Sequence, residues 1–384
     1  MFLFILISAL IVIPVSSIWP IIGTDVWYPQ FVMTVFFVFA TIAYQISKMS
    51  KAIALFFLYC VVSTVFIDRL YPTALIEMVQ MGGCLLIATS ISSLSEQQRK
   101  KVWYAILAVV VIQSAFGILQ MIGVDPFFRM KADYRLIDVC GFSGGRNQYG
   151  LSLASTAMAA IALCPYIIPF VLIAMFGSKT LTTLIAFIVA CLFFISKRTS
   201  KIKALMIMPV ALVLIPVFLH FAPKTSNKLY ERVAIWNLTI NQVNAGKITI
   251  PVNENIKKVV TGNVLTGYGM SSFFKLSPST QGNVINKAYD YRYEHAHNDY
   301  VETYFDLGLI GIAFLVWIFA EIIFMFHVKR NRTKLLIASA SALIVYAVSA
   351  VSIYTVHTAV SGFYLAVFVG LFYGALKDSE VKNA

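Results

Sequence analysis

Residues 293–311 read YEHAHNDYVETYFDLGLIG, which places a His-Ala-His-Asn cluster directly before a long apolar stretch. A membrane span needs about 20 apolar residues, and the stretch from Thr303 to Phe326 meets that requirement. Ionisable side chains at the edge of a span are costly to place, so they mark functional sites by default. The sequence therefore predicts a membrane helix with a polar, functional cluster at its entrance.

The composition of the 384-residue chain indicates a membrane protein throughout. Hydrophobic residues make up 59% of the sequence and charged residues 12%, whereas soluble domains are about 25% charged. We therefore expect an all-α polytopic membrane protein with about twelve transmembrane helices. Two readings stay open between residues 149 and 195, where the apolar segments are short. Pro165 and Pro169 favour a broken or re-entrant element there, as the alternative to full spans.

Basic residues recur in every second loop between the expected spans. They occur in the segments 48–51, 99–101, 197–203, 329–334 and 377–382. Cytoplasmic loops of membrane proteins carry such an excess of lysine and arginine. This pattern predicts an even number of spans, with both termini in the cytoplasm. It also accounts for much of the net charge of +13, so a nucleic-acid partner is excluded.

Three parts of the chain follow from this topology. Residues 1–221 are expected to hold transmembrane helices 1–9, with a periplasmic loop at 123–147. Residues 222–302 form a large periplasmic loop, and residues 303–384 hold helices 10–12 and a cytoplasmic tail. Within the large loop, Ser226–Gln242 has the spacing of an amphipathic helix and Val264–Phe274 is typical of a turn, while no sustained strand alternation is seen.

A second candidate site lies at the end of the loop 123–147, in the sequence GFSGGRNQYG at residues 141–150. Glycines followed by Arg146 and Asn147 at a helix start can present backbone amides and a guanidinium group to an anion. Since positive charge is otherwise sparse on this side of the membrane, the motif predicts an anion-binding residue in Arg146.

The order of the polar motifs resembles the bacterial O-antigen ligase and O-antigen polymerase superfamily, membrane glycosyltransferases of the GT-C type. Five segments between residues 141 and 311 carry the resemblance: GFSGGRNQYG (141–150), GSKTLTTLIAF (177–187), ERVAIWNLTI (231–240), NVLTGYGMSSF (263–273) and HAHNDYVETYFDLGLIG (295–311). The chain departs from the family pattern at four places. Lys179 stands where arginine is usual and Thr180 where glycine is usual; Val264-Leu265 replaces Pro-Leu, and Asp306 replaces a glutamate.

The resemblance implies a glycosyltransferase that takes a saccharide from undecaprenyl diphosphate and transfers it to a hydroxyl acceptor at the periplasmic face. The acceptor is lipid A–core in a ligase, which we favour, or a second lipid-linked glycan in a polymerase. The reaction is expected to be an inverting displacement without a metal or other cofactor. Donor, acceptor and membrane lipids are then the partners.

Site residues follow partly from the resemblance and partly from chemistry. His297 is expected to act as the base or to orient the acceptor, and Arg232 to bind the diphosphate, because fixed cations stabilise charge developing on a leaving group. Further substrate-binding candidates are Arg146, Lys179, Arg292, His295, Asn298 and Glu302. Asn298 is also a favoured helix N-cap. Glu302 and Asp306 share a helix face and are expected to orient His297 or to pair with arginines.

A transporter or flippase of lipid-linked oligosaccharides is the alternative from another class. Such proteins place polar groups within their spans near the middle of the membrane. Here Glu77 and Glu321 are the main ionisable residues inside the expected spans. Polarity is instead concentrated outside them, which favours chemistry at the membrane surface.

Overall fold

The computed structural model of the chain describes residue 39 and residues 42–67, 72–124, 146–198, 226–251, 257–274, 276, 295–328, 332–353 and 359–381. These residues are predominantly helical, and they divide into two compact units. Unit 1 comprises residues up to Ser90 together with Thr239–Glu294 and Thr303–Ile322, and unit 2 comprises Ile91–Leu238, His295–Glu302 and the residues from Ile323 onward.

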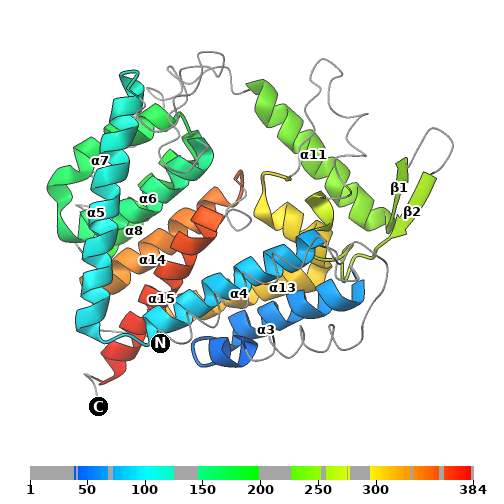
Figure 1. Cartoon of the computed structure of the whole chain (residues 1–384), viewed down its shortest axis with the longest axis horizontal. Helices are drawn as coiled ribbons and strands as arrows, with labels where there is room; N and C mark the ends of the chain where they lie inside the picture. Colours follow the sequence, from blue (N-terminus) through cyan, green and yellow to red (C-terminus); the bar gives the residue numbers. More distant parts are fainter. Residues whose placement is uncertain are drawn as a thin grey trace. The chain divides into compact units, whose positions relative to one another are not determined.

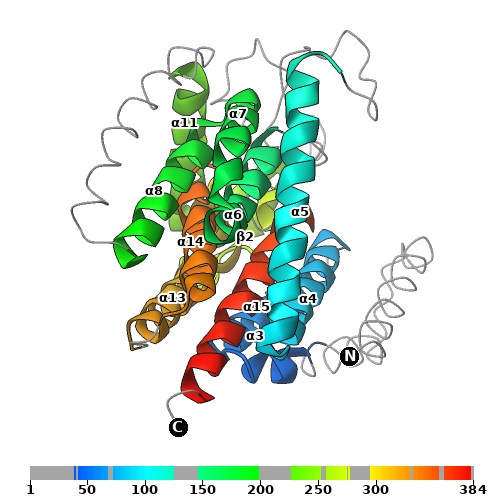
Figure 2. The same cartoon turned by 90° about the vertical axis from the view of Figure 1, so that its left-hand side faces the viewer.

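Unit 2 is a helix bundle built around α14 (Lys334–Ser349) (Figures 1 and 2). Five further helices form its body: α5 (Glu96–Met121), α6 (Arg146–Leu163), α7 (Ile168–Ser178), α8 (Leu181–Arg198) and α15 (Ala359–Val381). The α14 helix packs against α6, α8 and α15. Its run Ala338–Ala342 consists of buried alanines and serines. Small residues of this kind let helix backbones approach closely without relying on the hydrophobic effect.

The segment between residues 149 and 195 contains a helix break, as the prolines indicated, but the prolines do not kink a helix. Pro165 begins a 3₁₀ turn, Pro165–Ile167, and Pro169 lies in the first turn of α7. Proline suits such positions because the amides there have no intrahelical acceptor. The α7 helix has only 11 residues and ends at Lys179, whose φ of 52° is left-handed.

Unit 1 contains α3 (Lys51–Val62), most of α4 (Pro72–Ser92), the turn after residue 262 and the middle of α13 (Asp299–Val328). The last two residues of α4 belong to unit 2. Tyr59 of α3 stacks on Phe314 of α13 with ring centroids 5.7 Å apart. Its hydroxyl donates to the carbonyl oxygen of Leu307 over 3.0 Å. The large loop, where the sequence shows no sustained strand alternation, contains two short strands: β1 (Lys247–Pro251) pairs antiparallel with β2 (Lys257–Thr261). Strands of five residues are too short to give a sustained alternating pattern.

The α13 helix is interrupted at Gly308, inside the span that the sequence predicts as continuous. Gly308 adopts φ 63° and ψ −160°, a conformation accessible essentially to glycine alone. The turn beginning at Asn263 replaces the helix bonds lost there: the Leu309 amide donates to the Val264 carbonyl and the Tyr268 amide to the Phe305 carbonyl, both over 2.9 Å. The NVLTGYG motif therefore packs into the helix break.

Replacing Gly308 with alanine is expected to destabilise unit 1. A Cβ atom at Gly308 would lie 2.4 Å from the Leu265 carbonyl carbon and oxygen, and the backbone conformation alone costs about 1–3 kcal/mol for other residues. We expect Gly308→Ala to lower the melting temperature of the detergent-purified protein by several degrees. Gly83→Ala in α4 is the matched control, because nothing lies within 4 Å of a Cβ there. An unchanged melting temperature for Gly308→Ala would contradict the close packing of turn and helix.

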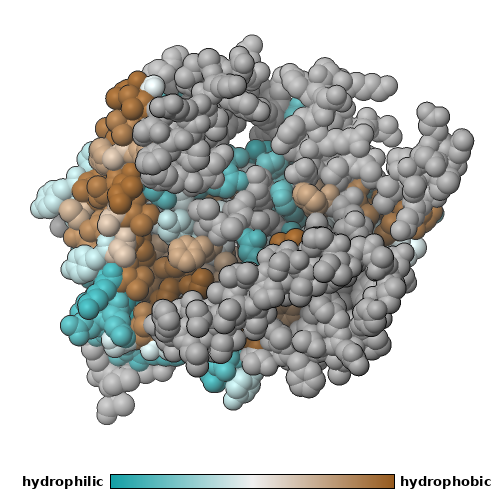
Figure 3. Space-filling model, in the orientation of Figure 1, coloured by the Kyte–Doolittle hydropathy of each residue, from teal (hydrophilic) through white to brown (hydrophobic). Residues whose placement is uncertain are grey.

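Four helices of the described chain are long and apolar enough to cross a membrane: Ala74–Ser92, Glu96–Met121, Leu181–Arg198 and Asp299–Val328. Figure 3 shows an apolar surface over α5 and α7 of unit 2, which ends in hydrophilic residues at the start of α5. Ile112 of α5 is 56% exposed and Ile173 of α7 is 50% exposed. Exposed side chains of this kind are consistent with a lipid-facing surface, and the described chain is consistent with a mainly helical membrane protein.

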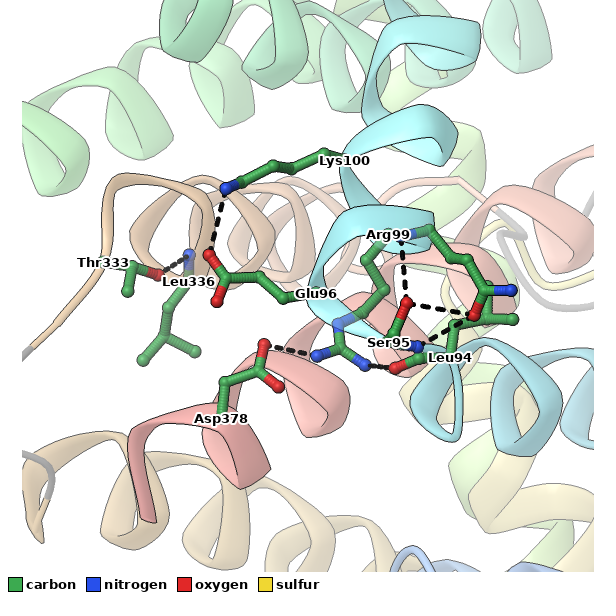
Figure 4. A network of polar contacts seen from close by, with 9 residues as sticks. Leu94, Ser95, Glu96, Arg99, Lys100, Thr333, Leu336 and Asp378 are labelled. Atoms are coloured by element: carbon green, nitrogen blue, oxygen red, sulfur yellow. Dashed lines mark hydrogen bonds and ion pairs between the residues drawn. The ribbon is translucent and has the colours of Figure 1, made fainter. Parts of the chain in front are cut away.

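The start of α5 is fixed by a buried arginine (Figure 4). Arg99 is 4% exposed, donates to the Leu94 carbonyl oxygen and pairs with Asp378 of α15. Ser95 and Gln98 form a capping box at the first turn of the same helix. Arg99, expected from sequence as a basic loop residue, thus joins the turn before α5 to α15.

Candidate active site at the start of α13

The His-Ala-His-Asn segment, His295–Asn298, is held within unit 2 between α11 (Ser226–Ala245) and the end of α14. The Trp236 indole of α11 donates to the Ala296 carbonyl oxygen over 2.7 Å. On the other side, the Asp299 amide donates to the carbonyl oxygen of Ala350, the residue after α14, over 2.9 Å. Backbone groups from three parts of the sequence therefore fix the conformation of this segment.

Asn298 caps α13, as its residue type predicted. Its Oδ1 accepts from the amides of Tyr300 and Val301 over 3.0 and 3.1 Å. The first amides of a helix have no intrahelical acceptor, and an asparagine at this position satisfies them.

Substitution of Asn298 separates capping from substrate binding. Asn298→Ala is expected to cost about 1 kcal/mol of stability, whereas Asn298→Asp keeps an oxygen for both amides. If capping is the role of Asn298 in the fold, the aspartate variant keeps the melting temperature of wild type and the alanine variant does not. Transfer activity lost in Asn298→Asp while its melting temperature stays that of wild type would point to a direct substrate contact.

Arg232 of α11 lies beside this segment. Its Nη1 donates to the carbonyl oxygen of Ser352 over 3.0 Å, and the Ser352 hydroxyl forms a hydrogen bond with the hydroxyl of Thr182 in α8. One guanidinium nitrogen is thus anchored on the backbone after α14. Because a guanidinium presents five N–H donors in a rigid planar arrangement, an anchored arginine can still offer donors to a ligand.

His297 is a partly buried histidine in an unusual backbone conformation. Its φ of 52° is left-handed, a region that non-glycine residues occupy rarely. Burial, the positive charge of Arg232 and the neighbouring His295 lower the pKa of His297 to about 3, with Glu302 acting in the opposite direction. His297 is therefore neutral at physiological pH and lies within electrostatic range of Arg232.

His295 is bound to a buried carboxylate. Its Nδ1 lies 2.8 Å from Oε1 of Glu302, while Oε2 of Glu302 accepts from the Ala296 amide over 2.9 Å. These hydrogen bonds join Glu302 to His295 and to the backbone between the two histidines, and the charge of Glu302 also acts on the pKa of His297. Asp306 of unit 1 instead accepts from the amides of Ser271 and Phe273 over 2.9 and 2.7 Å.

Lys179 lies in the turn between α7 and α8, beside a cluster of buried hydroxyl groups. The Thr180 hydroxyl is 2.7 Å from that of Ser178 and 2.5 Å from that of Thr183. A Cβ atom at Gly150 of α6 would lie 2.3 Å from the Thr180 Oγ1. The glycine-rich motif at 141–150 and the motif at 177–187 therefore meet in the fold, at Gly150.

The structure brings together Arg232, His295, His297, Asn298 and Glu302, all of which the sequence singled out. Lys179 precedes by three residues the Thr182 that bonds Ser352. Arg146 is the first residue of α6, but its side chain, like all of Arg292, lies outside the described residues. Sequence reasoning missed Ser352 and Ala350, because they contribute backbone carbonyl groups, which residue type does not reveal.

Residues 166–316 match the family model described as O-antigen ligase. The match includes Lys179, Arg232 and the segment His295–Glu302. This part of the chain is therefore similar to proteins of the O-antigen ligase family. The resemblance drawn from the five motifs is thereby confirmed at the level of the O-antigen ligase and polymerase superfamily. No curated protein sequence matches the chain closely enough to count as a relative.

The superfamily that this segment resembles has a general activity. Its members are glycosyltransferase-like enzymes that act on lipid-linked glycans in membranes. Among the described residues, no three histidine, cysteine, aspartate or glutamate side chains gather as a metal site would require. The candidate site thus consists of the arginine Arg232, whose guanidinium group is hydrogen-bonded to the backbone, the neutral His297, and the pair of His295 and Glu302 at the start of α13.

Proposed function

We propose that the protein transfers a saccharide from undecaprenyl diphosphate to a hydroxyl acceptor at the periplasmic face of the bacterial inner membrane. The observation that carries this proposal is the placement of Arg232 beside His297 within the segment that matches the O-antigen ligase model. A cation next to hydrogen-bonding imidazoles suits a reaction with an anionic leaving group and a hydroxyl nucleophile.

The proposed topology places this chemistry outside the cytoplasm. About twelve spans put both termini in the cytoplasm, and residues 222–302 form the large periplasmic loop that carries Arg232 and the two histidines. The start of α13 then lies at the periplasmic surface, where the diphosphate of a lipid-linked donor resides while its prenyl chain stays in the membrane.

The chemistry of the leaving group gives Arg232 its role. When the bond between the anomeric carbon and the phosphate oxygen breaks, the electron pair stays on the diphosphate, and negative charge grows there. Preorganised cations in a site of low dielectric constant are commonly the largest single contribution to such a reaction. Lys179, Arg146 and Arg292 are proposed as further cations for the same diphosphate.

His297 is proposed to orient the acceptor hydroxyl through hydrogen bonds. Because burial and Arg232 keep its imidazole neutral, one ring nitrogen donates and the other accepts. A fixed imidazole can therefore align the hydroxyl for attack on the face of the sugar opposite the diphosphate, which gives inversion. Of the two acceptors, we favour lipid A–core, as in a ligase.

The test is a comparison of surface polysaccharide and undecaprenyl-linked glycans from a host that lacks the gene, complemented with wild type or with His297→Ala. Long glycans retained on undecaprenyl diphosphate, with bare lipid A–core, would identify a ligase. Lipid A–core with a single repeat and no ladder would identify a polymerase. If neither pool changes on deletion, the proposal of glycosyl transfer is wrong and the transporter alternative gains support.

A further inference from the structure

We propose that His295 and Glu302 form the dyad that removes the proton from the acceptor hydroxyl, with His295 as the base and Glu302 as its positioning residue. This inference rests on the proposed function and assigns within it a step that His297 cannot perform well.

The Glu302 carboxylate fixes the orientation of the His295 ring. His295 Nδ1 lies 2.8 Å from Glu302 Oε1, a distance typical of a charge-assisted hydrogen bond. A carboxylate only accepts hydrogen bonds, so Nδ1 carries the proton and Nε2 becomes the accepting nitrogen. The carboxylate thereby selects the tautomer that a base requires, and it stabilises the imidazolium that forms.

The Glu302 carboxylate is buried and is fixed by further contacts. Its side chain is 2% exposed and its second oxygen accepts from the Ala296 amide over 2.9 Å. It lies in the first turn of α13, where the positive end of the helix dipole favours a negative charge. The Trp236 bond to Ala296 fixes the same peptide from the other side. These contacts hold the Glu302 carboxylate in place, as the positioning of His295 requires.

The two histidines differ in their charged surroundings. The His295 side chain is 18% exposed, so a substrate can reach it from the surface of unit 2. His297 is held neutral, its pKa lowered to about 3 by burial and by Arg232. Such an imidazole has little tendency to take a proton, because the efficiency of a general base depends on a pKa near the working pH.

The proposed step conserves atoms and charge. The acceptor O–H proton moves to His295 Nε2 while the oxygen forms a bond to the anomeric carbon of the donor sugar. The bond from that carbon to the phosphate oxygen breaks, and its electron pair leaves with undecaprenyl diphosphate beside Arg232. The imidazolium then releases its proton to water. One acceptor and one donor give one glycoside, one undecaprenyl diphosphate and one proton.

The experiment uses the purified full chain and membranes solubilised from the deletion host, in which the lipid-linked donor and the acceptor accumulate. We expect His295→Ala to lower the initial rate by about 10²–10⁴-fold and added imidazole to restore part of it. Imidazole is expected not to restore His297→Ala. His327→Ala, at the far end of α13, is the matched control and should keep the wild-type rate with and without imidazole.

Glu302 is tested by conservative replacement. Glu302→Gln is expected to lower the rate by about 10–10²-fold because an amide can hold His295 in the wrong tautomer, and Glu302→Asp should recover part of this loss. Each variant is first checked for a single, monodisperse species, and His295→Gln replaces His295→Ala if the latter does not purify. A His295→Gln or His295→Ala rate within twofold of wild type, while Arg232→Ala is inactive, overturns the dyad and leaves the proposed function intact. If the wild-type protein transfers nothing from the accumulated donor, the proposed function itself fails.

Discussion

Arg232→Ala is expected to reduce glycosyl transfer by about 10²–10³-fold, the size of effect seen when a fixed donor to a developing negative charge is removed. Its Nη1 donates to the Ser352 carbonyl oxygen over 3.0 Å, which orients the planar guanidinium group. The measurement is the initial rate of transfer from the accumulated lipid-linked donor. Binding of donor to the purified variant is measured alongside the rate, since an arginine that binds the diphosphate is expected to contact it in the ground state as well.

The control for Arg232→Ala is Arg332→Ala. Arg332 also donates to a backbone carbonyl, that of Phe326 over 3.0 Å, and lies over the Phe326 ring at 4.5 Å. Arg332→Ala therefore removes an arginine that is bonded to a backbone carbonyl oxygen outside the proposed site. Arg232→Lys keeps the charge but loses the planar set of donors, and we expect an intermediate rate. Wild-type donor binding and rate in Arg232→Ala would remove the diphosphate role.

The residues of the candidate site were predictable from sequence because their types are informative. The family pattern around His297 and Arg232 led to both side chains, and the structure places them within electrostatic range. Asn298 was recognisable as a cap, since few residue types suit that position. The amphipathic spacing of Ser226–Gln242 likewise predicted α11, which extends to Ala245.

Other features depend on tertiary packing, which residue type does not determine. The hydrogen bond between His295 and Glu302 and the left-handed conformation of His297 are not set by the spacing of the sequence. Gly308 lies within the apolar span that the sequence predicts from Thr303 to Phe326. Only the docking of the turn beginning at Asn263 explains why the helix opens there.

His297→Ala is expected to lower transfer by about 10²-fold, the cost of misplacing a reacting group by a small distance. His297→Asn is expected to retain more activity. Asparagine keeps a donor and an acceptor, and it is among the residues that occupy the left-handed region most readily. Both variants are compared with wild type in the same rate assay. If His297 were the base, asparagine would be no better than alanine, because an amide does not take up a proton at neutral pH.

Stability as a function of pH tests the same assignment without substrate. The pKa of His297 is lowered to about 3 in the folded protein, by burial, Arg232 and His295 against the opposing effect of Glu302, and an unfolded histidine titrates near 6.5. Below about pH 6.5 the unfolded chain binds a proton here that the folded chain does not, so stability falls as pH decreases through this range. We expect wild type to lose on the order of 1 kcal/mol more than His297→Asn between pH 7.5 and pH 5. His295 and Glu302 are present in both proteins, so the difference in melting temperature isolates His297. Equal losses in the two proteins would mean that folding does not lower the pKa of His297, and His297 would then again be a candidate for the base.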